Sequence, residues 1–383
     1  MKKYRIISST SPSEKTIGYG YILSGMLSFD YQKIFSVLVL KQKDELLSSL
    51  IADDKSIRVA QVLKYSGIGV SVVIGFFNLV LLMFNKYLNA GRIKNRNNIK
   101  YVLMTSGIEP ANIMLIHKYN ILNYYMVDGI VDYYSDRDGI RRFFGVCMAY
   151  ILECMIIASG LKNIILNSEY VKHCFQKRHN RLLKVFNVNI SILQIGHDLV
   201  NSPLNTNIKA PDLFTPYGFI YGNFDFAENM DGLVALSKSF DIKNAFNNTN
   251  LVIAGKNAIN ISREHISRFE KYFPSVYIVN SPENIHIFIE KSEYIIIPSL
   301  NCNGPKIKIL ESIMMNKTVF ASINCTKFFP KYFTSLISCE NNLLNTPYMI
   351  DKKMHQNNDN NLATLRDAWS YKARYLEFLD LLV

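Results

Sequence analysis

The sequence predicts an α/β protein built from two doubly wound domains, each with a parallel sheet between layers of helices. Three observations lead to this prediction. The chain has 383 residues, more than a single hydrophobic core usually serves, and 49% of them are hydrophobic. Short apolar runs alternate with helical stretches of ten or more residues, as in βαβ units. A segment with three prolines and no periodicity, 201–216, separates two such series and is expected to be a linker.

The first series occupies residues 1–205, which we expect to form the N-terminal domain. Its helices are expected over 56–87, Arg141–Ser159 and Glu169–Arg178, the last with Ser168 at the N-cap. Its strands are expected at Tyr4–Ser8, Ile34–Leu40, Lys100–Met104, Asn123–Val127, Asn163–Asn167 and Ser191–Ile195.

One stretch within this series, Gly67–Phe84, is apolar and uncharged, and basic residues follow it. At 18 residues it lies at the lower limit for a membrane span. Three interpretations stay open: a spanning helix, a helix lying on the membrane face, and a buried helix of the α/β layer. Its glycines and the strand that follows favour the last two.

The second series occupies residues 206–360, and an amphipathic tail follows over 361–383. A helix is expected from Pro305 to Met315, and the tail carries Trp369 and Tyr375 on its apolar face. The strands are expected at Phe219–Tyr221, Leu251–Ala254, Val276–Val279, Tyr294–Ile297 and Thr318–Ala321.

The charge balance points to an anionic partner. There are 43 Lys and Arg against 31 Asp and Glu, a formal net charge of +12. Phosphorylated substrates, an anionic membrane surface or nucleic acid would satisfy it, but no nucleic-acid-binding signature accompanies the charge. The six cysteines lack metal-binding spacing, so we expect no metal and a reduced, cytoplasmic compartment.

The segment 295–321 carries the most chemical information. The helix after Gly304 and Pro305 would present free backbone N–H groups to the carboxyl ends of the strands, where doubly wound sheets bind ligands. Lys308 and Glu311 share one face of this helix. A cation and a carboxylate at this place suit a nucleoside diphosphate, the lysine for phosphate and the glutamate for ribose. A surface ion pair is the alternative.

This segment resembles the donor-site signature of retaining GT-B glycosyltransferases of the GT4 family. The resemblance extends from about 152 to 321 and is weak before that; Glu153 stands where the family has a glutamate. It implies a GT-B fold with a cleft between an acceptor domain (1–205) and a donor domain (206–360), the C-terminal helix (361–383) packing back on the first. It also implies transfer of a sugar from a nucleotide-diphosphate donor, with no metal or other cofactor.

The resemblance assigns roles to particular residues. Glu311 matches the glutamate that holds the donor ribose, while Asn303 stands where the family has a second glutamate. The family's basic pair after the first glycine is absent, which leaves Lys256 and Lys308 as substitutes. The other residues expected at the donor are Gly18, Gly20, Gly222, Asn223, Gly304, Pro305 and Lys306.

The acceptor side is less defined. Asp128, with Asp132 nearby, is a candidate to face an acceptor hydroxyl, and solvated turn carboxylates are the alternative. The family's usual employment implies a glycan or lipid-linked acceptor in bacterial surface polysaccharide synthesis. The basic, apolar region 67–100 fits an acceptor carried on a membrane lipid and would hold the protein on the inner membrane face. Because Asn303 and the missing basic pair depart from the pattern, a catalytically impaired GT-B-like binding or scaffolding subunit is the alternative function.

Overall fold

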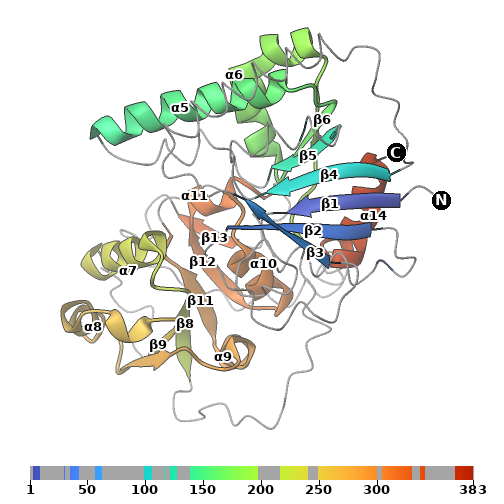
Figure 1. The fold of residues 1–383 in the computed structure, drawn as a ribbon. Helices are drawn as coiled ribbons and strands as arrows, with labels where there is room; N and C mark the ends of the chain where they lie inside the picture. Colours follow the sequence, from blue (N-terminus) through green and yellow to red (C-terminus); the bar gives the residue numbers. More distant parts are fainter. Residues whose placement is uncertain are drawn as a thin grey trace, which may run out of the picture. The chain divides into compact units, whose positions relative to one another are not determined.

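The computed structural model describes residues 3–8, 30, 35–42, 57–62, 99–105, 116, 121–126, 139–196, 216–239, 249–299, 304–329, 337–340 and 367–382. The chain forms two compact units (Figure 1). Unit 1 contains residues 1–196 and 371–383, and unit 2 contains residues 197–370. The chain therefore leaves unit 1 once and returns to it near its C-terminal end.

The sheet of unit 1 has seven parallel strands in the order β3-β2-β1-β4-β5-β6-β7. Val102, Leu103 and Met104 in its centre are fully buried, as expected of a parallel sheet covered on both faces. The strands are β1 (Lys3–Ser8), β2 (Phe35–Gln42), β3 (Ile57–Val62), β4 (Ile99–Thr105), β5 (Asn123–Met126), β6 (Asn163–Leu166) and β7 (Asn189–Ile192).

Two long helices of unit 1, α5 (Gly139–Ala158) and α6 (Glu169–Phe186), pack against each other. The side chain of Ser168 accepts a hydrogen bond from the Val171 N–H at 3.2 Å, which confirms the predicted N-cap of α6. The helix ends where Asn187 adopts a left-handed conformation with φ 52°.

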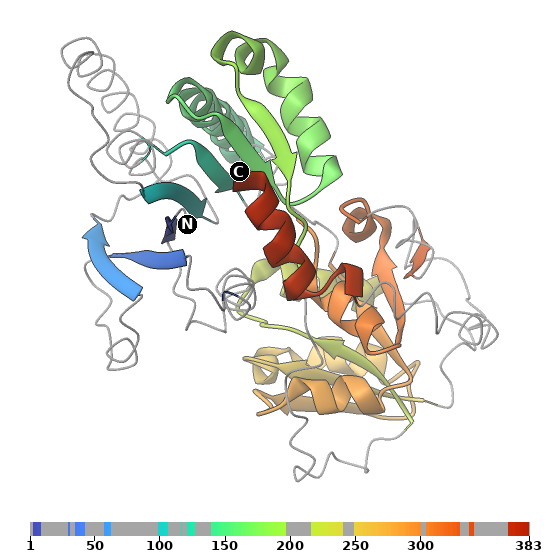
Figure 2. The same cartoon turned by 90° about the vertical axis from the view of Figure 1, so that its right-hand side faces the viewer.

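Another described helix of unit 1, α14 (Tyr371–Leu382), is seen along its length in Figure 2. Tyr371, Tyr375, Phe378 and Leu382 are buried at helical spacing, so one face of α14 belongs to the core of unit 1. The Tyr375 hydroxyl donates to Asp30 at 3.0 Å.

Unit 2 has a six-stranded parallel sheet in the order β10-β9-β8-β11-β12-β13. Its strands are β8 (Tyr217–Tyr221), β9 (Asn250–Gly255), β10 (Val276–Asn280), β11 (Tyr294–Ile297), β12 (Thr318–Ser322) and β13 (Ile337–Glu340). Its helices are α7 (Ala227–Ser239), the 3-10 helix η3 (Ala258–Asn260), α8 (Arg263–Phe269), α9 (Ile285–Lys291), α10 (Ile307–Met314) and α11 (Ile323–Thr326).

The predicted class, two doubly wound α/β domains, is confirmed. Four details of the prediction are wrong. Residues 57–62 form β3 instead of beginning a helix, β7 covers Asn189–Ile192 instead of Ser191–Ile195, α6 continues to Phe186 instead of ending at Arg178, and β13 was not predicted. Residues 57–62 pair with β2 from Val37 to Gln42. This tertiary pairing decides their conformation, whereas the prediction had joined them to the apolar, helix-like stretch that follows in the sequence.

The described helices include none long and apolar enough to cross a membrane. Gly67–Phe84 lies outside the described residues. Cys147, Cys154 and Cys174 are free, whereas Cys325 is disulfide-bonded, so the expectation of ordinary reduced cysteines is wrong for Cys325.

Candidate functional site

The strand order of unit 2 reverses between β8 and β11, and the predicted site residues gather there. The chain continues from β8 outward to β9 and β10 on one side, and from β11 to β12 and β13 on the other. All these strands are parallel, so their carboxyl ends share one edge of the sheet, where a doubly wound domain binds ligands. Tyr221 ends β8, and Lys308 and Glu311 lie on α10, which follows β11.

Glu311 is buried, and both of its carboxylate oxygens have hydrogen-bond partners. The Tyr221 hydroxyl donates to Oε2 at 2.7 Å, and Nε2 of His286, from α9, lies 2.5 Å from Oε1. A buried carboxylate is stable only when such groups replace its hydration. The two contacts therefore fix the carboxylate in one orientation.

The titration behaviour of both partners suits this arrangement. The hydrogen bond to Glu311 raises the pKa of His286 above its ordinary value, while burial opposes the shift. Burial, and then the nearby Glu311 charge, holds the pKa of Tyr221 well above 10. Tyr221 therefore remains a neutral donor, and protonation of His286 strengthens its bond to Glu311.

Lys308 lies beside this carboxylate, partly buried, one helical turn away. Its Nζ donates to Oδ1 of Asn229, on α7, at 3.0 Å and lies 5.5 Å from the centre of the Tyr221 ring. Burial, and then the neighbouring Lys306 charge, lowers the pKa of Lys308 to about 8. The ammonium group is therefore charged at neutral pH and close to losing its proton.

Two glycines bring the backbone into this corner. A Cβ atom on Gly222 would lie 2.6 Å from the Lys308 Nζ, so the ammonium occupies space that any other residue would fill. Gly255 has φ 140°, and a Cβ atom there would lie 1.8 Å from the Gly222 carbonyl oxygen. The Gly222 N–H donates to the Ala254 carbonyl at 3.1 Å, which joins the residue after β8 to the end of β9.

The start of α10 completes the site. Lys306 is its N-cap residue and makes no side-chain capping bond, and the first turn contains no acidic residue. The positive end of the helix dipole is thus left without an acidic side chain of its own. The Lys306 ammonium lies 2.5 Å from the Glu228 carboxylate of α7.

Of the residues predicted from the sequence, Gly222, Lys308 and Glu311 come together directly. Asn223 is joined to them through Asn229, whose side-chain amide donates to the Asn223 carbonyl at 2.8 Å. Gly304 and Pro305 immediately precede α10 and its N-cap.

Lys256 is exposed, and its ammonium pairs with Asp225 at 3.3 Å. Asp225 also accepts from the Asn257 side chain at 2.5 Å, and this bond is the main cause that lowers its pKa. The predicted substitute for the family's basic pair is therefore already paired with a carboxylate. The remaining predicted residues, Gly18, Gly20, Asp128 and Asn303, lie outside the described residues, as does Asp132.

Sequence reasoning missed three residues of the site, Tyr221, Asn229 and His286. Tyr221 and Asn229 flank the glycine loop that was identified, so their place next to Gly222 was a usable signal. His286 had no such signal, because it lies 25 positions before Glu311 and reaches it only through the folded sheet.

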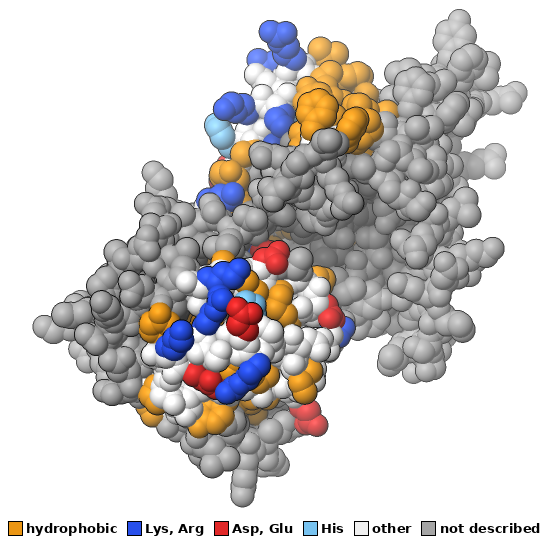
Figure 3. Space-filling model, turned by 90° about the vertical axis from the view of Figure 1, so that its left-hand side faces the viewer, with side chains coloured by type: hydrophobic (Ala, Val, Ile, Leu, Met, Phe, Trp, Pro, Cys, Tyr) orange, Lys and Arg blue, Asp and Glu red, His pale blue; other side chains and the backbone are white. Residues whose placement is uncertain are grey.

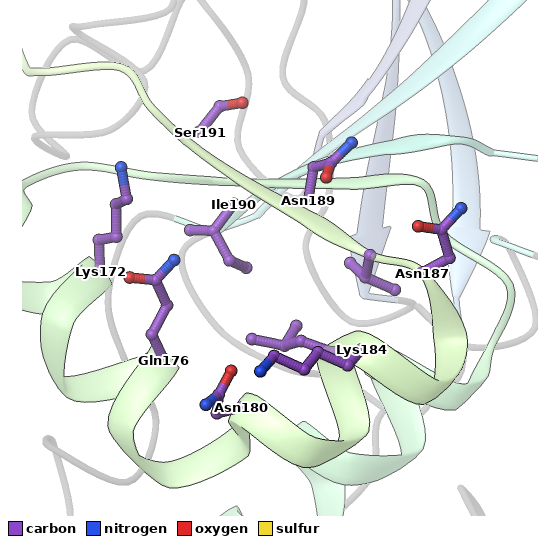
Figure 4. A pocket seen from close by; sticks show the side chains of 10 residues that line it. Lys172, Gln176, Asn180, Lys184, Asn187, Asn189, Ile190 and Ser191 are labelled. Carbon is purple, nitrogen blue, oxygen red and sulfur yellow. The ribbon is translucent and has the colours of Figure 1, made fainter.

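Unit 1 contains a polar groove of about 580 Å³ between α6 and β7 (Figure 4). Lys172 and Lys184 extend toward it from α6, and Asn189 and Ser191 line it from the strand. The described residues that line it include no carboxylate, histidine or thiol, so they offer hydrogen bonds and positive charge but no general acid or base at neutral pH.

Solved structures resemble this chain over their whole length. Anabaena HepE in complex with UDP has a TM-score of 0.61 and 10% identity, with 99% of each chain covered. The N-terminal domain of Candida albicans trehalose-6-phosphate phosphatase has a TM-score of 0.60 and 12% identity, covering 100% of this chain and 97% of that one. A glycosyltransferase from Rickettsia africae has a TM-score of 0.51 and 14% identity, covering 100% and 98%.

No protein-family model matches the sequence, and no curated protein matches it. At 10–14% identity the structural likeness concerns the fold. The chain has the GT-B fold, with two Rossmann-like domains, as the sequence resemblance predicted.

Proposed function

We propose that this chain is a glycosyltransferase that binds a nucleotide-diphosphate sugar at the switch point of unit 2. One observation carries the proposal: the buried Glu311 carboxylate and the Lys308 ammonium lie together where β8 and β11 diverge, beside the start of α10. Two structures with this fold bind related ligands, since HepE was solved with UDP and with UDP and glucose.

Each group has a role that follows from its chemistry. Glu311 accepts hydrogen bonds from the ribose hydroxyls, since each carboxylate oxygen has lone pairs beyond those facing Tyr221 and His286. Lys308 and the backbone amides at the start of α10 bind the diphosphate. When the sugar is transferred, the departing diphosphate gains negative charge, and these same groups stabilise it.

The remaining parts of the proposal concern the reaction and its setting. We propose retention of configuration at the sugar, a glycan or lipid-linked acceptor, and a place in bacterial surface polysaccharide synthesis at the cytoplasmic face of the membrane. Gly18, Gly20, Asn303 and Asp128 are proposed to complete the donor and acceptor sides. We also propose that no metal or other cofactor is required, because Lys308 supplies positive charge beside the start of α10. Full activity in EDTA would support this, and activity restored only by added divalent metal would exclude it.

The test is calorimetric titration with UDP, UDP-glucose and uridine as probes. Glu311→Ala should abolish detectable binding of all three, and Glu311→Gln should weaken it. Lys308→Met should weaken UDP binding about tenfold or more and leave uridine binding almost unchanged, because only UDP carries the diphosphate. Equal losses for UDP and uridine would contradict phosphate contact by Lys308. Unchanged UDP affinity in Glu311→Ala would contradict the site itself.

A second function is favoured by the ion pairs around the site. Lys306 is paired with Glu228 and Lys256 with Asp225, so two cations predicted to bind phosphate already have carboxylate partners. This supports a catalytically impaired GT-B-like subunit that binds or organises a partner. Transfer assays with a panel of nucleotide sugars separate the two functions. A chain that binds a nucleotide sugar but neither transfers the sugar to any acceptor nor hydrolyses the donor would favour the subunit.

A further inference from the structure

Among the described residues, the exposed large apolar side chains are concentrated on one layer of unit 1. Seven of the ten large hydrophobic residues that are exposed among the described residues lie on α5 and α6. Single exposed hydrophobic residues are ordinary on a protein surface, but a concentration of them marks an interaction site. We call this area the α5–α6 surface; its apolar members are Phe143, Phe144, Tyr150, Ile151, Tyr170, Val185 and Phe186.

The apolar members on α5 lie along one side of that helix. Phe143, Tyr150 and Ile151 follow the i, i+7, i+8 spacing of one side of a helix. Phe143 is 67% exposed and Phe144 is 58% exposed, although buried residues such as Leu152 and Ile156 of the same helix belong to the core. Helix α5 therefore has an apolar side in the core and a second apolar side in solvent.

The neighbouring helix supplies positive charge. Helix α6 contains one acidic residue, Glu169, and five basic residues, Lys172, Lys177, Arg178, Arg181 and Lys184. Arg178 lies 3.4 Å from the buried Glu153 of α5 and Lys172 lies 3.9 Å from Glu169, but the other three make no ion pair with any described residue. Figure 3 shows the blue cationic side chains next to the orange apolar ones on one face of the molecule.

The two helices are held together as one rigid layer. His179 of α6 lies 2.6 Å from the Glu153 carboxylate, and its ring stacks on Tyr150 at 4.8 Å between centroids. Both Glu153 and His179 are buried. The apolar side of α5 and the basic side of α6 are thus fixed relative to each other.

We propose that the α5–α6 surface binds an anionic lipid bilayer. Aromatic side chains next to lysine and arginine are the chemistry of interfacial binding: the rings enter the boundary between head groups and acyl chains, and the cations meet lipid phosphates. A second copy of this chain would place the same basic helix against itself, which charge repulsion opposes. Nucleic acid would use the cations but leave the exposed phenylalanines unexplained. The inference does not depend on the nucleotide-sugar proposal.

The test is co-sedimentation of the full chain with vesicles of phosphatidylcholine, alone or mixed with phosphatidylglycerol in equal parts. The wild type should bind the mixed vesicles, and added salt should weaken the binding. The double variants Phe143→Ser/Phe144→Ser and Lys177→Gln/Arg181→Gln should each bind the mixed vesicles at least about tenfold more weakly than the wild type. Ile259→Ser and Lys271→Gln, exposed changes on unit 2, serve as matched controls and should bind as the wild type does.

A second measurement keeps an aromatic side chain at the proposed contact. The chain has one tryptophan, Trp369, which is buried, so Phe143→Trp adds a reporter at the proposed contact. Its emission should shift to shorter wavelength when anionic vesicles are added. The proposal would be overturned if the wild type did not bind the vesicles, or if the double variants bound them as well as the wild type does. It would also be overturned if the wild type formed a dimer without vesicles and the same substitutions abolished that dimer. UDP titration of the same samples tests the donor site separately.

Discussion

Among single residues, Lys308 links the site to pH. Its pKa of about 8 is lowered by burial, and a bound diphosphate would favour its charged form and raise that pKa. We therefore expect UDP affinity to fall up to about tenfold per pH unit above pH 8, because binding must then take up a proton. Calorimetry across this range checks the prediction. Lys308→Arg should flatten the profile, and an unchanged profile in that variant would assign the titration to another group.

His286 connects the site to stability. Because Glu311 raises its folded-state pKa, its contribution is fully present below the unfolded-state pKa of about 6.5 and is lost as pH rises through the folded value. His286→Asn should therefore lower the Tm more at pH 5.5 than at pH 9. Thermal unfolding at both pH values measures this difference. In a Glu311→Gln background the difference should disappear, and its persistence would mean that another group raises the pKa.

The residues differ in how far they could be found from sequence. Lys308 and Glu311 were identified because their i, i+3 spacing on one helix is a local property. Asn229 and His286 contact them from α7 and α9, and only the parallel sheet brings those helices together. Their contributions depend on tertiary packing, which a linear pattern does not encode.

At the scale of elements, two glycines at the ends of β8 and β9 shape the site for different reasons. Gly255 has a positive φ and lies against backbone, whereas Gly222 leaves room for a side chain. Gly255→Ala would force a side chain into a left-handed backbone and against the Gly222 carbonyl, so we expect a loss of at least about 2 kcal/mol in unfolding free energy. Gly222→Ala meets the flexible end of Lys308 instead. It should cost less stability and mainly weaken UDP binding. Urea denaturation and UDP titration of both variants measure this contrast, and equal stability losses would contradict it.

The elements that were predicted well are those buried on both faces. All five residues of β8 and all four of β11 are buried, and their continuous apolar runs made them recognisable. Strand β3 was missed because its sequence borders a long apolar stretch that favours helix, and β13 because four residues with polar neighbours carry little pattern. In both cases pairing with an adjacent strand supplies the stability.

For the whole molecule, α14 is part of unit 1 although it follows unit 2 in the sequence. Phe378 is 1% exposed, and Phe378→Ala should lower the unfolding free energy of unit 1 by about 3 kcal/mol or more. Leu376, on the same helix but 52% exposed, provides the control, and Leu376→Ala should cost less than about 1 kcal/mol. Hydrogen exchange resolves the two units, and faster exchange in unit 2 alone would contradict the assignment.

The two-domain plan followed from chain length and from the proline-rich segment 201–216. The sequence pattern predicts divisions after 205 and after 360, whereas the compact units divide after Gly196 and after Ser370. Trp369 marks the second crossing: it is buried beside Phe329 of unit 2, and the next helical residues enter unit 1. An amphipathic pattern gives the apolar face of such a tail but not the point where it changes domain.

This crossing affects the order of events during translation. A ribosome completes every residue of unit 2 before it makes Tyr371–Leu382, so unit 2 is free to fold while unit 1 still lacks its last helix. Until then unit 1 lacks the apolar residues of α14, among them Phe378 and Tyr375, that are buried in the finished chain. Newly made chains are therefore expected to depend on chaperones chiefly through their N-terminal half.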